Sequence, residues 1–403
     1  MSELEQVDLL TGPGAGTILE AALGTEGATI MRWEVHALHH RPSAGVSVGY
    51  TLQVRDSGGA EASQYVCATT SRLTDERAPG LVRLDHPSGR VTVHVWRHPH
   101  DPELPALPPA CDARTMSRAL GRDVTVHMVA YRPTRRCVLK LSDGEAARAF
   151  VKVVRPRVLP DLVGRHELLT GAGVPAPRVL HHDPDGLVVL SPASGTPLAN
   201  FLARGLDDPV ATFDATMSVL DRLPSGVLSL KRHPSWSERV DHYAHAAATA
   251  LPERAEQARW IAAAVSRAMH DADAGPVVPT HGDWYEANIF MADTTAVSSI
   301  LDVDSVGPGH RVDDIACLLG HVSVLPHLAP DVYPHVPAIL DAWWERAIES
   351  VDARSLAARS AAVTLSLVAG ARNPGDDDSW REDALGRADE AARWLGRAGQ
   401  SVR

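Results

Sequence analysis

The first half of the chain carries short runs in which β-branched and aromatic residues alternate with polar ones or are concentrated between turn signals. Such runs, bounded by Gly, Pro, Asn and Asp, are typical of β-strands. They form two blocks, separated by the proline-dense stretch Arg97–Asp112, which we interpret as an extended connector and a domain boundary. The expected strands are Val46–Val54, Gln64–Thr70 and Arg90–Trp96 in the first block, and Arg136–Leu141, Arg148–Val154 and Gly186–Ser191 in the second.

The second half carries apolar residues at the three- and four-residue spacing of helices that face a core. The first of these helices begins at the capping residue Asp208 and ends before Pro224. A β-rich part followed by a helical part predicts an α+β fold with a cleft between the two parts. The expected helices are Asp208–Leu223, Ser237–Leu251, Glu253–His270, Arg311–Val322 and Val336–Ser350, with two more up to Leu395.

The two β-rich blocks resemble each other in sequence. One interpretation is a degenerate duplication of a small sheet, in which Cys67 takes the place of Lys152. The other is chance similarity between β-rich stretches, and the sequence leaves both open. In a duplication the first block would lack a helix, because Thr70–Leu81 is too short to hold one. The matching stretches, in the same order, are the Arg-Pro dipeptides at Arg41 and Arg132, then Tyr65–Cys67 with Phe150–Lys152, then His86–Val93 with Asp183–Leu190.

Composition narrows the class of protein. The chain has 403 residues, a net charge of −11 and four cysteines, none of them in a CxxC pair. An acidic balance argues against nucleic acid or an anionic membrane as the main partner, because both favour Lys/Arg-rich surfaces. No apolar run approaches the ~20 residues of a membrane helix. Met1–Leu10 also lacks the basic-then-apolar order of a signal peptide, so we expect a cytoplasmic protein with reduced thiols.

Several familiar motifs occur in the wrong context. Gly45–Gly49 reads GxSxG, but a strand follows Ser47 where a nucleophile elbow needs a helix. His166–Thr170 lacks the second histidine of a zinc-binding HExxH helix. The histidines and the aspartate near the proline-rich turn are interpreted as solvated loop residues in preference to a metal site; they are His94, His98, His100 and Asp101.

One polar cluster does occur in a context that fits a known motif. The loop "HGDWYEAN", His281–Asn288, has the H-x-D-x-x-x-x-N spacing of a kinase catalytic loop. Phosphoryl transfer to a hydroxyl needs a carboxylate that accepts the hydroxyl proton, and Asp283 supplies one. It also needs oxygen ligands for Mg²⁺, and Asn288 supplies one of these. Asp302, at the end of the apolar strand in "SSILDVD", supplies another.

A phosphate-binding cation is also required, and the strand "RAFVKVV" carries Lys152 in its middle. Such a lysine either leaves the sheet at an edge or faces a cleft with a counter-ion. In kinases the strand lysine pairs with a helix glutamate, and Glu167 is the best-placed partner. Each residue of this set also has a structural alternative as a turn, cap or edge residue. Their joint occurrence in the required order favours the catalytic interpretation.

These motifs resemble the aminoglycoside phosphotransferase and choline kinase-type family of small-molecule kinases. The resemblance covers about Ala119 to the C-terminus and is strongest at Thr280–His321, in "THGDWYEANIF" and "ILDVDSVGPGHRVDDIACLLGH". It implies a protein-kinase-like two-lobe fold, with a β-rich N-lobe at residues 111–190 and a helical C-lobe at residues 191–403. The β-rich residues 1–110 precede these lobes, as the cap does in maltokinase-like members. One departure is the turn "YRPTRRC", which has no glycine and could use the charges of Arg135 and Arg136 instead.

The resemblance also implies roles for single residues. Asp283 would be the catalytic base, with His281 bracing the loop and Asp314 accepting hydrogen bonds from its backbone. Asn288 and Asp302 would bind Mg²⁺. The nucleotide, ATP with GTP left open, would contact Lys152, Glu167 and a hinge at Ser191–Ala193.

The expected reaction is phosphorylation of a hydroxyl on a small polar molecule, such as an aminoglycoside, a sugar or an amino sugar. Trp284, Tyr285 and Glu286 of the loop are the candidate acceptor contacts, and Trp236, Asp241 and Tyr243 could join them after folding. The alternative is a catalytically inactive nucleotide-binding scaffold of the same fold. The sequence specifies neither the acceptor nor the oligomeric state.

Overall fold

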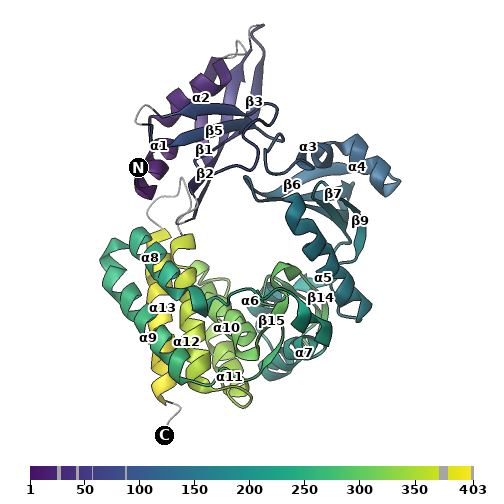
Figure 1. Ribbon diagram of the computed structural model, residues 1–403. Coiled ribbons are helices and arrows are strands. Elements are labelled where there is room, and N and C mark those ends of the chain that lie inside the picture. The colour runs from purple at the N-terminus through teal and green to yellow at the C-terminus, as the bar shows by residue number, and fades with distance from the viewer. Residues whose placement is uncertain (25–28, 42–44, 57, 87–88, 372–379, 401–403) are drawn as a thin grey trace. The chain divides into compact units, whose positions relative to one another are not determined.

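The computed structural model describes residues 1–24, 29–41, 45–56, 58–86, 89–371 and 380–400 (Figure 1). The chain divides into two units. The first comprises Met1–Val163 and Val179–Pro192, and the second comprises Gly164–Arg178 and Ala193–Arg403. The later crossing from one unit to the other, between Pro192 and Ala193, falls in the segment predicted as the hinge.

An antiparallel sheet begins the first unit, and helices α1 (Glu3–Thr11) and α2 (Ala15–Leu23) cover one of its faces (Figure 1). The Tyr50 hydroxyl, fully buried, donates to the carbonyl oxygen of Leu10 at 2.6 Å and so ties the sheet to α1. The strand order is β1-β2-β3-β5-β4. The strands are β1 (Thr29–Arg41), β2 (Gly45–Arg55), β3 (Glu61–Thr69), β4 (Val82–Asp85) and β5 (Thr92–Arg97).

A second antiparallel sheet in the same unit has the corresponding order, β6-β7-β8-β10-β9. Its strands are β6 (Thr125–Arg132), β7 (Arg136–Asp143), β8 (Ala146–Val154), β9 (Val179–Asp183) and β10 (Leu187–Leu190). Helix α5 (Leu159–Gly171) stands between β8 and β9 in the sequence, whereas Thr70–Leu81 holds no helix between β3 and β4.

The strand registers support the duplication, which we therefore keep as a proposal. Arg41 pairs with Gly45 and Arg132 pairs with Arg136, so the first hairpin of each sheet has the same turn length. Counting from these turns, the pair Ser47 and Thr69 corresponds to the pair Val138 and Lys152. The register thus puts Thr69, and not Cys67, in the place of Lys152. Pro42, part of the first Arg-Pro match, lies outside the described residues.

The proline-rich segment between the sheets is folded, which corrects the expectation of an extended connector. It contains helix α3 (Leu107–Cys111), and α4 (Ala113–Leu120) follows directly. Leu104, Leu107 and Ala110 are buried in one core cluster with Trp96 of the first sheet and Leu139 of the second. The predicted boundary at residue 110 therefore lies inside the core of the first unit.

Asp101, expected to be a solvated loop residue, is buried at the junction of the two sheets. Its Oδ2 accepts hydrogen bonds from the Tyr131 hydroxyl and the Thr134 N–H, both at 2.7 Å. Its Oδ1 accepts from the Glu103 N–H at 2.9 Å. Trp96 of the first sheet in turn donates to the Tyr131 hydroxyl at 3.2 Å. Burial raises the pKa of the Asp101 carboxyl, while these hydrogen bonds oppose that rise. One carboxylate thus satisfies three donors that the junction buries.

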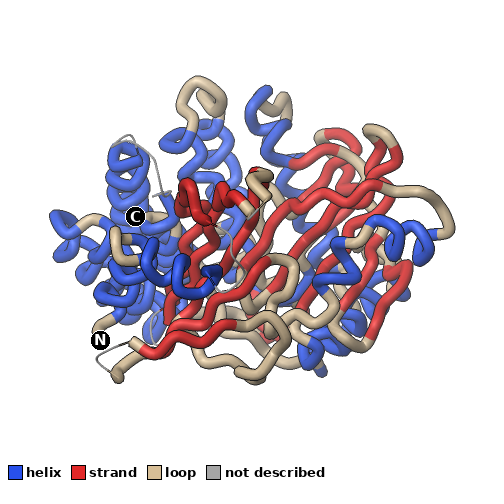
Figure 2. The backbone as a smooth tube through the Cα atoms, turned by 90° about the horizontal axis from the view of Figure 1, so that it is seen from above, coloured by secondary structure: helices blue, strands red, loops and turns tan. Residues whose placement is uncertain are grey.

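The second unit is built mainly from helices, the class of element drawn blue in Figure 2. Its small sheets have the orders β11-β13-β14 and β12-β15. The strands are β11 (Thr196–Pro197), β12 (Val277–Thr280), β13 (Ile289–Asp293), β14 (Ala296–Ile300) and β15 (Gly307–His310). The helices are α6 (Leu198–Arg204), α7 (Pro209–Asp221), α8 (Val240–Ala250), α9 (Ala255–Asp271), α10 (Arg311–Leu328), α11 (Val336–Ala347), α12 (Ala353–Ser366) and α13 (Trp380–Gln400).

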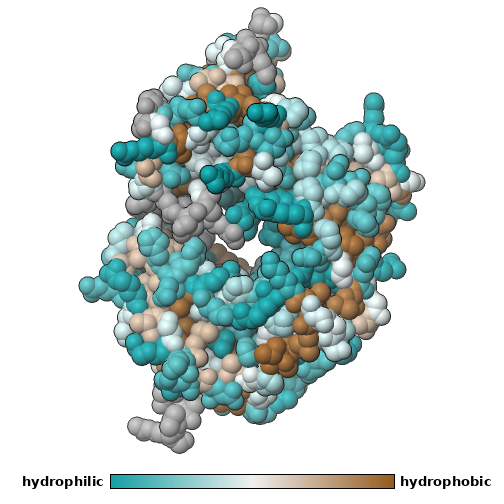
Figure 3. All heavy atoms as spheres, in the orientation of Figure 1, coloured by the Kyte–Doolittle hydropathy of each residue, from teal (hydrophilic) through white to brown (hydrophobic). Residues whose placement is uncertain are grey.

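This arrangement confirms the predicted α+β class, with β-rich residues first and helices second. The face drawn in Figure 3 is mostly hydrophilic, with smaller apolar areas between. Among the described residues, none of the helices combines the length and the apolar character needed to cross a membrane.

Replacing Asp101 by Asn is expected to destabilise the first unit. The amide places an N–H₂ group where an oxygen now faces the Thr134 or Glu103 N–H, so one buried donor loses its acceptor. We expect the free energy of unfolding to fall by about 2–3 kcal/mol, measured by urea denaturation. Asp123→Asn is the control, because Asp123 is exposed and should change stability by less than about 0.5 kcal/mol. Equal stability of the two variants would contradict the role of Asp101.

Candidate active site

The loop His281–Asn288 connects β12 to β13 in the second unit. β12 pairs antiparallel with β15, and the Thr280 hydroxyl donates to the Gly307 carbonyl oxygen at 2.8 Å. Gly282 has a φ of +79°, and a Cβ at this position would lie 2.8 Å from the Ser305 carbonyl oxygen. Both the left-handed backbone and the lack of space require glycine here.

Asp314, in the first turn of α10, fixes the start of the loop. Its carboxylate accepts hydrogen bonds from the backbone N–H groups of His281, at 3.0 Å, and Gly282, at 2.8 Å. Arg311 Nη1 lies 3.6 Å from the same carboxylate. Burial raises the pKa of Asp314 to about 6, although the Gly282 hydrogen bond and Arg311 act in the opposite direction. The structure therefore gives this buried acid two loop donors and a cation as partners.

His281 is fully buried behind the loop. Burial lowers its pKa to about 4, so the imidazole is neutral at pH 7. Nε2 lies 3.0 Å from the Leu301 carbonyl oxygen and must carry the proton, because the carbonyl only accepts. Nδ1 is then free of a proton and accepts the Asp283 N–H at 3.3 Å. The ring thus links the backbone of Asp283 to the strand end that precedes Asp302.

Asn288 closes the loop at its other end. Its side-chain Nδ2 donates to the Asp283 carbonyl oxygen at 3.0 Å, and its own backbone carbonyl oxygen accepts the Leu301 N–H at 2.8 Å. Asp302, the next residue, has a φ of +54°, an unusual conformation for a residue other than glycine. The structure therefore brings Asp283, Asn288 and Asp302 together through hydrogen bonds of neighbouring backbone groups.

The donors at this place fit Mg²⁺. Asn288 uses its amide nitrogen within the loop, which leaves the amide oxygen as a ligand, and Asp302 adds a carboxylate. Mg²⁺ prefers such hard oxygen donors, takes only one or two carboxylates, and fills the remaining positions with water and substrate phosphate oxygens. In the part of the chain that the structure describes, no group of three or more His, Cys, Asp or Glu could hold a metal. A site completed by a phosphorylated ligand is consistent with this donor set.

The middle of the loop differs from the sequence-based hypothesis. Trp284, a candidate acceptor contact, is fully buried in the core and packs edge-on against His281, with ring centroids 5.2 Å apart. Its side chain has no face left for a ligand, which corrects that hypothesis. Glu286 is also buried, and burial raises its pKa to about 7. Tyr285 is half-buried, and its ring stacks on His321 of α10 at 4.4 Å.

The predicted nucleotide contacts are divided between the units. Lys152 is buried in β8, between Val138 of β7 and Val188 of β10. Because β8 is the central strand, the edge-strand alternative for this lysine is excluded. Ser191 belongs to the first unit and Ala193 to the second. Glu167 is an exposed residue of α5 that belongs to the second unit, so its expected pairing with Lys152 stays a prediction.

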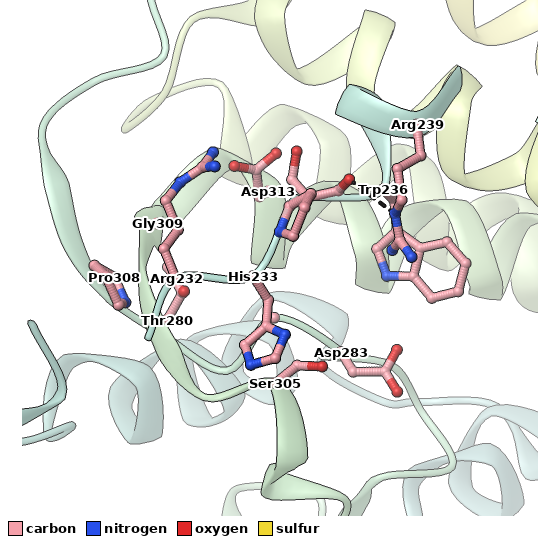
Figure 4. Close-up of a pocket in the computed structure, with 13 residues that line it drawn as sticks. Arg232, His233, Trp236, Arg239, Thr280, Asp283, Ser305, Pro308, Gly309 and Asp313 are labelled. Carbon is pink, nitrogen blue, oxygen red and sulfur yellow. Dashed lines mark hydrogen bonds between the residues drawn. The ribbon is translucent and has the colours of Figure 1, made fainter. Parts of the chain in front are cut away.

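A pocket of about 210 Å³ lies beside Asp283 within the second unit (Figure 4). Most of the residues that line this pocket were not predicted from the sequence as site residues. The segment "KRHPSWSER" supplies Arg232, His233 and Arg239 together with the suspected Trp236. Its clustered basic residues around a tryptophan were the available signal. The full lining is Arg232, His233, Pro234, Ser235, Trp236, Arg239, Thr280, Gly282, Asp283, Ser305, Pro308, Gly309 and Asp313.

Replacing Asp314 by Asn is expected to loosen the loop. The amide nitrogen would face one of the two loop N–H groups, leaving a buried donor without an acceptor. We expect a loss of about 2 kcal/mol in the free energy of unfolding and faster amide hydrogen exchange in peptides that cover residues 280–288. Asp331→Asn, at an exposed position, is the control. Unchanged exchange in these peptides would show that Asp314 does not fix the loop.

Part of the chain is similar in sequence to a known protein family. Residues 135–333, which include β7 to β10 and the whole loop, match the model of the phosphotransferase enzyme family, APH. No curated protein sequence matches the chain.

Solved structures with detectable similarity include several small-molecule kinases. A choline/ethanolamine kinase family protein from Mesorhizobium loti is 17% identical, with 69% of this chain and 92% of that one covered and a TM-score of 0.47. The aminoglycoside phosphotransferase APH(4)-Ia is 14% identical, with 72% of this chain and 98% of that one covered and a TM-score of 0.46. The aminoglycoside phosphotransferase APH(3'')-Id from Streptomyces rimosus, in complex with ADP and streptomycin, is 19% identical. The similarity covers 69% of this chain and 96% of that one, with a TM-score of 0.41.

Because these TM-scores lie below 0.5, the structural similarities do not strengthen the match to the family model. The match itself covers the residues that carry the predicted chemistry, and it confirms the expectation of a phosphotransferase enzyme. The similarity to the phosphotransferase enzyme family therefore extends over residues 135–333, slightly less than half of the chain.

Proposed function

We propose that this protein transfers the γ-phosphoryl group of ATP, with Mg²⁺, to a hydroxyl group of a small polar acceptor. The observation that carries the proposal is the construction of the loop around Asp283. Asp314, His281 and Asn288 hold its backbone through four hydrogen bonds, while the Asp283 side chain lines a pocket. A carboxylate held in this way can orient an acceptor hydroxyl with little reorganisation.

We assign the following roles to these groups in the proposed reaction. The acceptor hydroxyl donates its hydrogen bond to Asp283, which takes the proton as the new oxygen–phosphorus bond forms. The bond between the γ-phosphorus and the bridging oxygen breaks, and ADP leaves with that electron pair. Asn288 and Asp302 would hold Mg²⁺, which would neutralise charge on the phosphate oxygens. Lys152 would contact the nucleotide phosphates, and the hinge at Ser191–Ala193 would contact the base.

The acceptor class expected from the resemblance is an aminoglycoside, a sugar or an amino sugar. The alternative of an inactive nucleotide-binding scaffold would share the nucleotide site but would release no ADP in the presence of any acceptor. GTP could replace ATP without changing the roles of these residues.

Asp283→Asn tests the catalytic base. The amide keeps the size of the side chain but cannot take the acceptor proton, so we expect kcat to fall about 10²- to 10⁴-fold. The measurement is ADP release with an acceptor found by screening sugars, amino sugars, aminoglycosides and amino alcohols. Thermal stabilisation by ATP with Mg²⁺ should persist, which shows that the fold and the nucleotide site survive. Turnover near the wild-type level would remove Asp283 from the mechanism.

Asp302→Asn tests the metal site. The non-hydrolysable analogue AMP-PNP should raise the melting temperature of the wild-type protein in Mg²⁺, and EDTA should remove most of that rise. In the variant we expect the Mg²⁺ concentration for half-maximal stabilisation to increase about tenfold or more, because one of two protein ligands loses its charge. Asp331→Asn should behave as the wild type. A nucleotide effect that is independent of Mg²⁺ would contradict the proposal.

A further inference from the structure

The pocket beside Asp283 carries basic side chains on the wall that a phosphate acceptor would contact. Arg232, His233 and Arg239 come from one segment, which runs into η4 (Ser237–Arg239) and the start of α8. Figure 4 shows the Arg239 side chain beside Trp236, with His233 and Asp283 among the other residues that line the pocket. An aminoglycoside carries several ammonium groups, so a pocket built for it should present acids here and not arginines.

The ion pairs around the pocket leave one of these cations without a carboxylate. Arg232 donates to both oxygens of Glu238 at 2.7 Å, so its charge is neutralised in place. The carboxylate of Asp313, which also lines the pocket, is paired with Arg359. Arg239 makes no ion pair with any residue that the structure describes, and it contacts two aromatic rings and one carbonyl oxygen.

Arg239 is nevertheless held in place. Its guanidinium lies over the rings of Trp236, at 5.2 Å, and Tyr243, at 5.6 Å. Its Nε donates to the Ser235 carbonyl oxygen at 3.4 Å. These contacts hold the exposed guanidinium beside the two rings, and no described carboxylate pairs with its terminal N–H groups. A planar fork of donors in fixed orientation suits a carboxylate or phosphate, which accepts two parallel hydrogen bonds.

A series of ring contacts connects this arginine to the catalytic loop. Trp236 packs edge-on against His321 of α10, with centroids 5.7 Å apart, and His321 stacks on Tyr285 at 4.4 Å. Tyr285 lies in the loop two residues after Asp283. Packed rings therefore connect the Arg239 guanidinium to the loop that carries Asp283.

Positively charged residues also lie near His233. Burial lowers the pKa of His233, and the charges of Arg165, Lys231 and Arg239 lower it further, while Asp304 acts in the opposite sense. Arg165 is buried and its Nη2 lies 3.4 Å from His233 Nε2. Among the charges that act on this imidazole, the three cations outnumber the single carboxylate of Asp304.

The volume of the pocket limits the size of the acceptor. At about 210 Å³ it is smaller than typical sites for drug-sized ligands, which occupy about 300–1,000 Å³. A molecule with one ring or a short open chain suits it better than a multi-ring aminoglycoside.

We propose that the acceptor is a small hydroxyl compound bearing an anionic group, a carboxylate or a phosphate, and that Arg239 binds this group while Asp283 meets the hydroxyl. The inference rests on the proposed function and specifies its substrate class. The anionic group stays unreacted, and the transferred phosphoryl forms its new bond to the hydroxyl oxygen only. Sugar acids, hydroxy acids and sugar or polyol phosphates share this chemistry.

Matched acceptors of different charge test the inference. One set is glycerol, D-glycerate and glycerol 3-phosphate, and the other is glucose, gluconate, glucose 6-phosphate and glucosamine, with kanamycin added as a polycation. ADP release gives kcat and KM for each compound. We expect an anionic member of a set to exceed its neutral counterpart at least tenfold in kcat/KM. The comparison of carboxylate with phosphate members identifies which anion is preferred.

Variants of Arg239 test whether this residue causes the preference for anionic acceptors. In Arg239→Ala we expect the ratio of kcat/KM for the anionic over the neutral member to fall about 10- to 100-fold, with the loss mainly in KM. Arg239→Lys should restore part of it, since it keeps the charge without the fork. Arg259→Ala is the matched control, because Arg259 is an exposed arginine of α9 without an ion pair in the described structure. It should leave all constants unchanged.

Calorimetric titration of glycerol 3-phosphate and gluconate, in the presence of AMP-PNP and Mg²⁺, provides a measurement that needs no turnover. Binding that Arg239→Ala weakens supports the inference. A neutral or cationic acceptor that outperforms the anions, an equal loss for neutral and anionic members in Arg239→Ala, or no anion binding would overturn it. The proposed function fails separately, when no Mg²⁺-dependent nucleotide stabilisation and no ADP release occur with any compound.

Discussion

The hydrogen bonds from two consecutive loop N–H groups to the buried carboxylate of Asp314 are the constraint on which the site depends. A carboxylate in this position needs donors, because an unpaired buried charge is costly. The loop N–H groups need an acceptor for the same reason. Both needs are met only when Gly282 adopts a left-handed conformation, and this conformation leaves no space for a side chain. The backbone direction of Asp283 follows from that turn, and His281 and Asn288 then hold the residue from two further sides.

The parts of this site that the sequence predicts are those encoded by short-range spacing. The interval from His281 to Asn288 specifies a loop closed by local hydrogen bonds, and Asp314 stands in the first turn of a helix that follows soon after. The burial of Trp284 could not be predicted in this way, because it depends on helices that pack on the loop from distant positions. Arg239 was missed for a related reason. Its proposed role depends on the contact of Trp236 with His321, about eighty residues later in the sequence, and no local pattern encodes that contact.

The first unit shows how a departure from the family pattern is compensated. The turn between β6 and β7 has no glycine, yet Thr134 adopts a φ of +63°. Its N–H donates to Asp101 at 2.7 Å, and its carbonyl oxygen accepts from Arg155 Nε at 2.6 Å. Both polar groups of this strained residue are therefore held by side chains, and the conformation persists because its surroundings determine it. The residues that precede the N-lobe thus contribute directly to the shape of a turn that the resemblance places over the nucleotide.

The net charge of −11 and the basic wall of the pocket are compatible, because binding depends on the local field and not on the total charge. An anionic acceptor must approach ATP phosphates of the same sign. At a separation of about 8 Å and an effective dielectric constant near 20, two unit charges repel by about 2 kcal/mol. A guanidinium beside the acceptor offsets a repulsion of this size, whereas an acidic wall would increase it. For a cationic acceptor the phosphates themselves provide attraction, and an arginine at this position would oppose binding. The placement of Arg239 on two aromatic rings, without a described carboxylate to neutralise it, is therefore consistent with the proposed anionic acceptor.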